Sequence, residues 1–322
     1  MCQYFRGKKF IVFSFFCILV RIISILFHFE FLSYRFFPIF FHTFFHISKK
    51  ISYIVMKLIF KGRILFSYEF GIFPFDKRYD YLEQLLSSLG SVFRITKASQ
   101  CELAKHLILP IPFSKSNLEP KSFCHSLNSN QILWGGLFPD YITDFCHHHG
   151  IYCYDFMEND SVAIYNSIAT AEGAICEAIK RSDKNLHGRN CLVVGYGRCG
   201  KTLAHKLNGL GAKVTICSTK DAHISEAYTY GYQVEKTSDL LHIVKKFDYI
   251  FNTAPKILFT RDVIANLSNH CIYLELASLP YGIDFCEAKA KNKKAFLCSG
   301  LPGIYSPQSC AEILFQYIKE AM

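Results

Sequence analysis

The stretch "CLVVGYGRCGKTLAHKLNGLGAKVTICSTK", residues 191–220, runs from an apolar strand through a glycine turn and an amphipathic helix to a second strand. Gly195, Gly197 and Gly200 complete the pattern G-x-G-x-x-G. In such a unit the first glycine makes a tight turn, the second lets the backbone approach a pyrophosphate, and the third lets the helix pack on the strand. The helix N-terminus then faces the anion. Because strand and helix flank the glycines in the required order, the stretch predicts a dinucleotide-binding site.

The end of the second predicted strand bears on the choice of cofactor. An NAD-binding unit usually places Asp or Glu there to accept from the ribose 2′-hydroxyl, whereas a 2′-phosphate needs hydroxyl and basic donors. Here Ser218, Thr219 and Lys220 end the strand, and Asp221 falls beyond it. Arg198 in the glycine turn adds a second cation nearby. We therefore predict NADP, with NAD as the alternative if Lys220 is only a solvated loop residue.

A further part of the predicted cofactor site is "NTAP", residues 252–255. This segment ends a predicted strand and so lies at the edge where open parallel sheets bind ligands. The complete set of predicted cofactor contacts is Gly195, Tyr196, Gly197, Arg198, Cys199, Gly200, Ser218, Thr219, Lys220, Asn252, Thr253 and Ala254.

Strands and helices alternate from about residue 64 to the end of the chain. Such alternation is typical of parallel sheets with helices on their faces. The sequence therefore predicts an α/β protein with two Rossmann-like, doubly wound domains and a C-terminal helix that returns to the first domain. The predicted segments are an N-terminal α/β domain on the substrate or partner side (61–165), an interdomain helix (166–185), an NADP-binding domain (186–300) and a C-terminal crossover helix (301–322).

The predicted interdomain helix rests on "SIATAEGAICEAIKRS", residues 167–182. Its apolar positions Ala174, Ile175 and Ala178 keep to one face of a helix. Thr170 is the expected N-cap, because a threonine hydroxyl can accept from a free N–H group of the first turn. The helix is therefore expected to begin near residue 170.

Residues 1–60 differ in composition from the rest of the chain. They contain 15 of the 31 Phe, no Asp and a single Glu. Residues 10–29 are about long enough to cross a bilayer, but Arg21 near their centre would cost roughly 2.5–3.5 kcal/mol. No small-x-small cleavage site follows, so a signal peptide fits less well. We interpret this hydrophobic extension first as a start-site artefact or dispensable segment, with Met56 as a later start, and second as a membrane anchor.

Charge and cysteine usage limit the classes of partner. The formal net charge is +10, but Lys and Arg are spread singly, without the basic stripe and interleaved aromatics of a nucleic-acid-binding surface. The 14 cysteines form no C-x-x-C pair and several lie in apolar strands, which is typical of reduced, cytoplasmic proteins. "CHHHGIYC", residues 146–153, holds metal-ligand residue types, but three successive His cannot face one ion from a regular element. We predict no nucleic-acid partner and no metal site.

Six short stretches form a pattern that extends from residue 76 to the C-terminus. They are "DKR" (76–78), "NSIATAEGAI" (166–175), "VVGYGRCGKTLA" (193–204), "NTAP" (252–255), "ELASLPYGIDF" (275–285) and "GLPGIYSPQSCAEIL" (300–314). Together they resemble the family of dipicolinate synthase A subunits. There are two departures: "GIFPFDKR" stands where the family has a glycine-rich turn, and Glu275 and Tyr281 stand where it tends to have "DLAS" and a pair of glycines.

The resemblance implies an NADP-dependent oxidoreductase that works with a second, flavoprotein-like B subunit. The family's substrate is a dihydro- or hydroxytetrahydro-dipicolinate from the lysine pathway, and its product accumulates with calcium in the spore core. The implied setting is the mother-cell cytoplasm of a sporulating bacterium. We also expect a homo-oligomer, with membrane contact only if residues 10–29 insert.

Forming the aromatic ring of dipicolinate requires removal of a proton from one ring carbon and a hydride from another. Glu172 and Asp284 are the candidate bases. Asn166, Thr170 and Ser278 are the candidates to hold a substrate carboxylate. A plain helix start at Thr170 and Glu172 is an equally open interpretation.

Two other functions fit the same sequence. A D-2-hydroxyacid dehydrogenase or adenosylhomocysteinase-like oxidoreductase shares the two-domain layout. The hydroxyacid enzymes need a late His near the nicotinamide, however, and no His follows His270. A non-catalytic NADP-binding regulatory subunit, which would bind NADPH without turnover, is the alternative from a different class.

Overall fold

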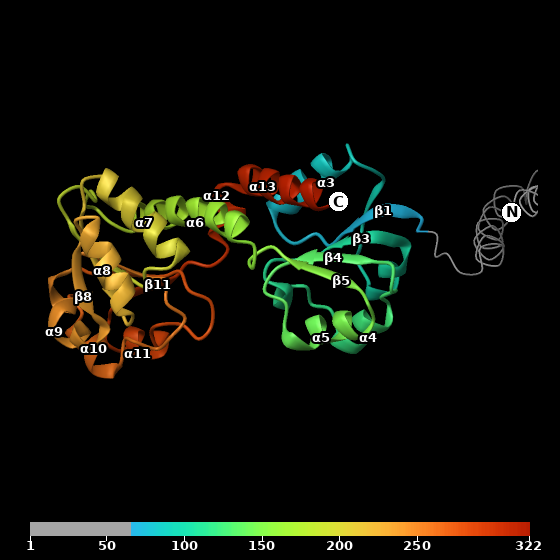
Figure 1. Cartoon of the computed structure of the whole chain (residues 1–322). Helices are drawn as coiled ribbons and strands as arrows, with labels where there is room; N and C mark the ends of the chain where they lie inside the picture. Colours follow the sequence, from blue (N-terminus) through green and yellow to red (C-terminus); the bar gives the residue numbers. More distant parts are fainter. Residues whose placement is uncertain (1–65) are drawn as a thin grey trace, which may run out of the picture. The chain divides into compact units, whose positions relative to one another are not determined.

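The strands within residues 66–322 form two parallel sheets (Figure 1). The computed structural model describes residues 66–322, which form one unit. The strand order is β2-β1-β3-β4-β5 in the first sheet and β11-β10-β9-β6-β7-β8 in the second. The first order is that of flavodoxin-like folds, and the second, counted from β6, is the Rossmann order. The predicted fold class of two doubly wound, Rossmann-like domains is confirmed, while the predicted extension 1–60 lies outside the described residues.

The first sheet carries a helical layer on each face. Phe70 and Ile72 point to the face covered by helices α3 and α13, and Leu107 and Leu133 point to the face covered by α4 and α5. This alternation follows from the two-residue period of a strand. The elements are β1 Tyr68–Ile72, α3 Lys77–Leu86, β2 Val92–Arg94, β3 Ala104–Ile108, α4 Pro120–His125, β4 Ile132–Gly135, α5 Asp140–His148 and β5 Tyr152–Asp155.

The second sheet is covered in the same way. Cys191 and Val193 of its central strand pack toward α6, α7 and α8, whereas Leu192 and Val194 pack toward α9, α10 and α11. The elements are β6 Asn190–Val194, α7 Arg198–Gly209, β7 Lys213–Ser218, α8 Asp221–Thr229, β8 Gln233–Lys236, α9 Leu240–Ile243, β9 Tyr249–Asn252, α10 Arg261–Asn266, β10 Ile272–Glu275, α11 Phe285–Ala290 and β11 Lys294–Leu297.

The helix that joins the two sheets, α6, begins earlier than its sequence predicts. It spans Asp160–Lys180 and is capped by Asn159, whose side chain accepts from the N–H group of Val162 at 3.0 Å. The prediction of an N-cap at Thr170 is therefore wrong. Thr170 lies inside the helix, where its hydroxyl donates to the carbonyl oxygen of Asn166, four residues earlier.

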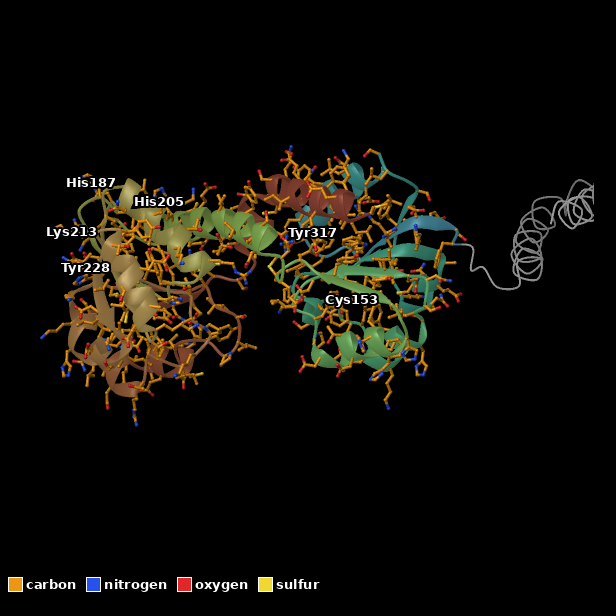
Figure 2. The ribbon with its side chains drawn as sticks, viewed as in Figure 1. Cys153, His187, His205, Lys213, Tyr228 and Tyr317 are labelled. Carbon is orange, nitrogen blue, oxygen red and sulfur yellow. The ribbon has the colours of Figure 1, made fainter. Side chains whose placement is uncertain are left out.

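Two C-terminal helices, α12 (Leu301–Tyr305) and α13 (Pro307–Ala321), return the chain to the first sheet. Figure 1 shows α13 beside α3, and Leu314 and Ile318 of α13 belong to the core of the first domain. Tyr317, labelled in Figure 2, stands edge-on to the ring of Trp134 at 6.1 Å between centroids. Because Trp134 is the only tryptophan of the chain and is fully buried, its fluorescence reports on this packing.

Cysteines of the described region are free thiols, and seven of the twelve are buried. Buried thiols behave as small apolar side chains, which accounts for their presence in strands such as β6 and β7. Within residues 66–322 no helix is long and apolar enough to cross a bilayer. The same residues hold no group of three or more His, Cys, Asp or Glu arranged for a metal ion.

Candidate dinucleotide-binding site

The glycine turn between β6 and α7 has the geometry of a phosphate cradle. Gly195 has φ +93°, in the left-handed region that side chains rarely adopt. A Cβ atom on Gly195 or Gly200 would lie closer than 3.0 Å to a neighbouring oxygen, that of the Thr253 hydroxyl or the Gly195 carbonyl respectively. A Cβ on Gly197 would meet no atom within 4 Å. Packing therefore requires the first and third glycines, whereas the second borders open space.

The N-terminus of α7 leaves donors for a ligand. Its N-cap residue, Gly197, has no side chain to accept from the N–H groups of the first turn. Helix starts of this kind bind anions, because the unpaired N–H groups and the helix dipole both favour negative charge. The open space at Gly197 and these donors together fit the pyrophosphate of a dinucleotide.

At the end of β7 the predicted 2′-phosphate ligands have different surroundings. Ser218 is buried, and its hydroxyl accepts from the N–H of Lys220 at 3.2 Å and lies 3.3 Å from Nδ1 of His223. Thr219 and Lys220 are exposed. Lys236 of β8 is also exposed and pairs with a surface carboxylate, that of Asp221, at 2.8 Å. Thr219, Lys220 and Lys236 are thus the groups at this edge that a phosphate can reach.

Three predicted contacts in the glycine turn take other partners. The Arg198 guanidinium donates to the carbonyl oxygen of Met157 at 3.0 Å and to Asp160 at 3.1 Å, at the start of α6. The Tyr196 ring is 3% exposed and packs in the core. Cys199 is half-buried, and burial raises the pKa of its thiol, which favours the neutral form. Arg198 thus reaches acceptors outside the second sheet, and its role as a second cation near the 2′-phosphate stays a prediction.

The turn after β9 packs against the glycine turn. Thr253 donates its hydroxyl hydrogen to the carbonyl oxygen of Val194 at 2.9 Å. Asn252 is fully buried, and its amide donates to the Ala254 carbonyl at 3.0 Å and to Glu275 at 2.7 Å. The Asn252 side chain is therefore committed to structure rather than to a ligand, whereas Thr253 and Ala254 are half-buried beside the glycine turn.

Glu275 is a buried carboxylate that the sequence-based site did not include. It is 0% exposed and accepts four hydrogen bonds, two at each oxygen. Burial raises the pKa of the Glu275 carboxyl, and the hydrogen bonds oppose that rise. A signal was present, because the strand segment "IYLELA" places one acid between apolar residues, but the donors around it could not be inferred from the segment itself.

The candidate catalytic residues lie on different elements. Glu172 is exposed on α6 and pairs with Lys206 of α7 at 2.8 Å. Asp284 caps α11 through Oδ1, which accepts from the N–H groups of Cys286 and Glu287 at 2.8 and 3.2 Å. Helices α6 and α11 pack on opposite faces of the second sheet. The structure therefore does not bring Glu172 and Asp284 together as a pair.

The remaining candidates divide between the same two regions. Asn166 and Thr170 are half-buried, one turn apart on α6, and joined by the hydrogen bond from the Thr170 hydroxyl. Ser278 is exposed in the loop that joins β10 to α11. Because Asp284 ends that loop, Ser278 and Asp284 share one segment at the carboxyl edge of the second sheet, where folds of this type bind ligands.

A buried ion pair marks the start of α3 in the first domain. Asp76 accepts from the backbone N–H of Arg78, and the two side chains are joined at 2.7 Å. Arg78 is almost fully buried and also donates to the Ile111 carbonyl. A Cβ on Gly303 of α12 would lie closer than 3.0 Å to the Asp76 carboxylate. Helix α12 therefore packs closely against the Asp76–Arg78 ion pair of the first domain.

Comparison with known proteins bears on the class of the chain. A family model described as "S-adenosyl-L-homocysteine hydrolase, NAD binding domain" matches residues 167–298. The A subunit of dipicolinate synthase from Bacillus subtilis strain 168 is 36% identical over 165 residues, which are 51% of this chain and 56% of that relative. The chain thus matches about half the length of this curated relative.

Solved structures extend the similarity to most of the chain. The crystal structure of the dipicolinate synthase A subunit from Bacillus halodurans has a TM-score of 0.71 at 26% identity and covers 80% of this chain and 99% of that one. D-lactate dehydrogenase from Escherichia coli has a TM-score of 0.56 at 13% identity, covering 79% and 95%. At that identity the dehydrogenase shows the shared fold only.

The two sheets, the glycine turn and the NAD-binding match define a two-domain protein with a nicotinamide-dinucleotide-binding domain, an architecture shared with many oxidoreductases. Nothing in the geometry of residues 66–322 conflicts with these similarities. The chain is similar in sequence and in structure to dipicolinate synthase A subunits, and the resemblance that its sequence motifs predict is confirmed.

Proposed function

We propose that the chain is the NADP-dependent A subunit of a dipicolinate synthase and oxidises dihydrodipicolinate to dipicolinate. The observation that carries the proposal is the open cradle at Gly197 in a chain homologous to this subunit. The partner is a B subunit, as the name of the relative implies, and the enzyme is a homo-oligomer. Its setting is the mother-cell cytoplasm during sporulation.

The proposed reaction removes two hydrogens from the ring. Dihydrodipicolinate loses a hydride from one ring carbon and a proton from another, which yields dipicolinate, and a hydroxytetrahydrodipicolinate would first lose water. An oxidised nicotinamide held by the glycine turn would supply the acceptor for this hydride. The protein must therefore hold the dinucleotide, orient the ring and its two carboxylates, and supply a base for the proton.

Residues of the chain divide this work. The N–H groups at the start of α7 would hold the pyrophosphate, and Thr219, Lys220 and Lys236 would bind a 2′-phosphate, which is why we favour NADP over NAD. Asp284 is the better candidate base of the two acids. Its Oδ1 caps α11, but no group within residues 66–322 donates to its Oδ2, and Ser278 in the same loop could hold a substrate carboxylate.

The proposal is tested with the full chain, the B subunit of a dipicolinate synthase, NADP and dihydrodipicolinate supplied by a dihydrodipicolinate synthase. We expect NADPH and dipicolinate in equal amounts, with no reaction when this chain is omitted. NADPH binding without any dipicolinate would overturn the proposal and favour the regulatory role.

A matched pair of variants tests the base. Asp284→Asn should lower kcat by roughly 10²–10⁴-fold, the usual contribution of a general base, while the Kd for NADPH stays unchanged. Glu172→Gln, which removes the acid of the surface pair with Lys206, should leave kcat within about threefold. Loss of activity in the Gln variant alone would contradict the assignment.

A second candidate function follows from the match to the NAD-binding domain of S-adenosylhomocysteine hydrolase over residues 167–298. An oxidoreductase related to that enzyme or to the D-2-hydroxyacid dehydrogenases would oxidise a hydroxyl group rather than a ring carbon. Reduction of the cofactor by S-adenosylhomocysteine or a D-2-hydroxyacid, in the absence of the B subunit, would favour it over dipicolinate formation.

A further inference from the structure

We propose that Glu275 is a positioning residue that sets the affinity of the glycine turn for its dinucleotide without touching it. The proposal rests on the cofactor part of the function proposed above. Glu275 is 0% exposed, so no ligand can contact its carboxylate. Its effect must therefore pass through the groups that donate to it.

The carboxylate joins its own strand β10 to the end of β9 and to both ends of the loop 276–283. Oε1 accepts from the Asn252 amide at 2.7 Å and from the N–H of Ala277 at 3.1 Å. Oε2 accepts from the Tyr273 hydroxyl and from the N–H of Gly282, both at 2.8 Å. Ala277 and Gly282 stand near the two ends of the loop 276–283, so one side chain fixes both ends of the loop that carries Ser278.

Contacts continue from Asn252 to the glycine turn. The Asn252 amide closes the turn after β9, because Nδ2 donates to the Ala254 carbonyl and Oδ1 accepts from the Ala254 N–H. Thr253, between them, donates to Val194 and lies against Gly195. Displacement of Asn252 would therefore shift the support on which the first glycine of the cradle rests.

Space around the network is too small for it to adjust. A Cβ on Gly282 would lie closer than 3.0 Å to both the Asn252 amide and the Tyr273 hydroxyl. Replacement by glutamine also cannot satisfy all four donors, because its amide nitrogen does not accept a hydrogen bond. Whichever way the amide is turned, the backbone N–H of Ala277 or of Gly282 faces another N–H and loses its partner. Glu275→Gln is thus a shape-conserving change that opens one end of the loop.

The experiment measures NADPH and NADH binding to the full chain by nicotinamide fluorescence, at a temperature where circular dichroism shows each variant fully folded. Glu275→Gln should raise the Kd for both nucleotides at least tenfold. Glu287→Gln is the matched control, because Glu287 is a carboxylate of the same domain that pairs with Arg261 and Lys291. It should stay within twofold of the wild type.

A purely structural role for Glu275 makes a different prediction. It would lower the melting temperature but leave the Kd of the folded protein unchanged, and that result overturns the proposal. If Glu275→Gln does not fold, Tyr273→Phe removes one donor and keeps the other three. It should raise Kd severalfold, and an unchanged Kd overturns the proposal as well. A wild-type chain that binds neither nucleotide overturns both this inference and the proposed function, whereas binding with no response to these variants overturns this inference alone.

Discussion

Two alanine substitutions in the glycine turn should have opposite effects on stability and on cofactor binding. A Cβ on Gly197 meets no protein atom within 4 Å, and the residue has φ −85°, which alanine adopts without strain. A Cβ on Gly200 would lie closer than 3.0 Å to the Gly195 carbonyl oxygen. Gly197→Ala should therefore act on the ligand, and Gly200→Ala on the fold.

The magnitudes follow from these surroundings. Gly197→Ala gains about 0.4–1 kcal/mol through the unfolded state and loses a similar amount as a poorer N-cap, so the melting temperature should stay within about 2 °C. Gly200→Ala gains about 1 kcal/mol of helix propensity but forces an overpacked contact that costs about 1–3 kcal/mol. At about 2–4 °C per kcal/mol, Gly200→Ala should melt up to about 8 °C lower.

Cofactor affinity, unlike stability, should be lowered by Gly197→Ala. The methyl group of Gly197→Ala keeps a pyrophosphate away from backbone N–H groups, and each hydrogen bond to a charged group contributes about 1.5–3 kcal/mol. The Kd for NADPH should therefore rise by about 10–100-fold. Differential scanning calorimetry and nicotinamide fluorescence on the same preparations measure both quantities. A Gly197→Ala protein that binds NADPH with wild-type affinity would refute the assignment of this turn as the phosphate cradle.

Other predictions test the 2′-phosphate site and a buried histidine. Lys220→Glu should raise the Kd for NADPH by about 10–100-fold and that for NADH by less than about threefold, because only the 2′-phosphate is lost as a partner; equal changes would place Lys220 outside the site. Burial lowers the pKa of His106 from 6.5 to about 4, so the unfolded chain takes up a proton that the folded chain does not. The contribution of neutral His106 to the free energy of unfolding is complete above pH 6.5 and should fall by ~3 kcal/mol at about pH 4. Urea unfolding followed by Trp134 fluorescence measures this loss. The variant His106→Gln, which keeps an acceptor for the Trp134 N–H, should not show that part of the loss.

The fold could be predicted because its determinants are local. Apolar runs of strand length, the glycine turn and helical spacing fix each element, and alternation of strand and helix then leaves a parallel sheet as the simple solution. Prediction of the α6 start failed because the choice of N-cap depends on tertiary packing. Thr170 and Asn159 are both capable caps, and the choice between them depends on whether the chain before Thr170 packs as helix, which Val162 and Ala169 do.

The site was less predictable because side-chain direction depends on partners distant in sequence. Arg198 belongs to the glycine turn, yet its guanidinium donates to Asp160, 38 residues earlier. Glu275 is a single acid in an apolar strand, but its structural role depends on Asn252, 23 residues earlier, and on a loop that folds back over it. Sequence spacing places such residues on elements, whereas their function is set by which donors and acceptors the tertiary structure supplies.

Most acids at the carboxyl edges of both sheets accept hydrogen bonds from the loops that carry them. Asp76 caps α3, Asp155 accepts from Phe138 and Met157, and Glu275 holds the loop 276–283. These loops have no strand partners, so their N–H groups require side-chain acceptors. Asp284 serves its helix with one oxygen only. Asn is as good an N-cap as Asp, so Asp284→Asn keeps that cap and removes only the capacity to take up a proton, whereas Asp284→Ala would confuse loss of a base with loss of the helix start. Because the cap is kept, turnover retained in Asp284→Asn would show that Asp284 is not the base, and a structural change in α11 could not explain the result.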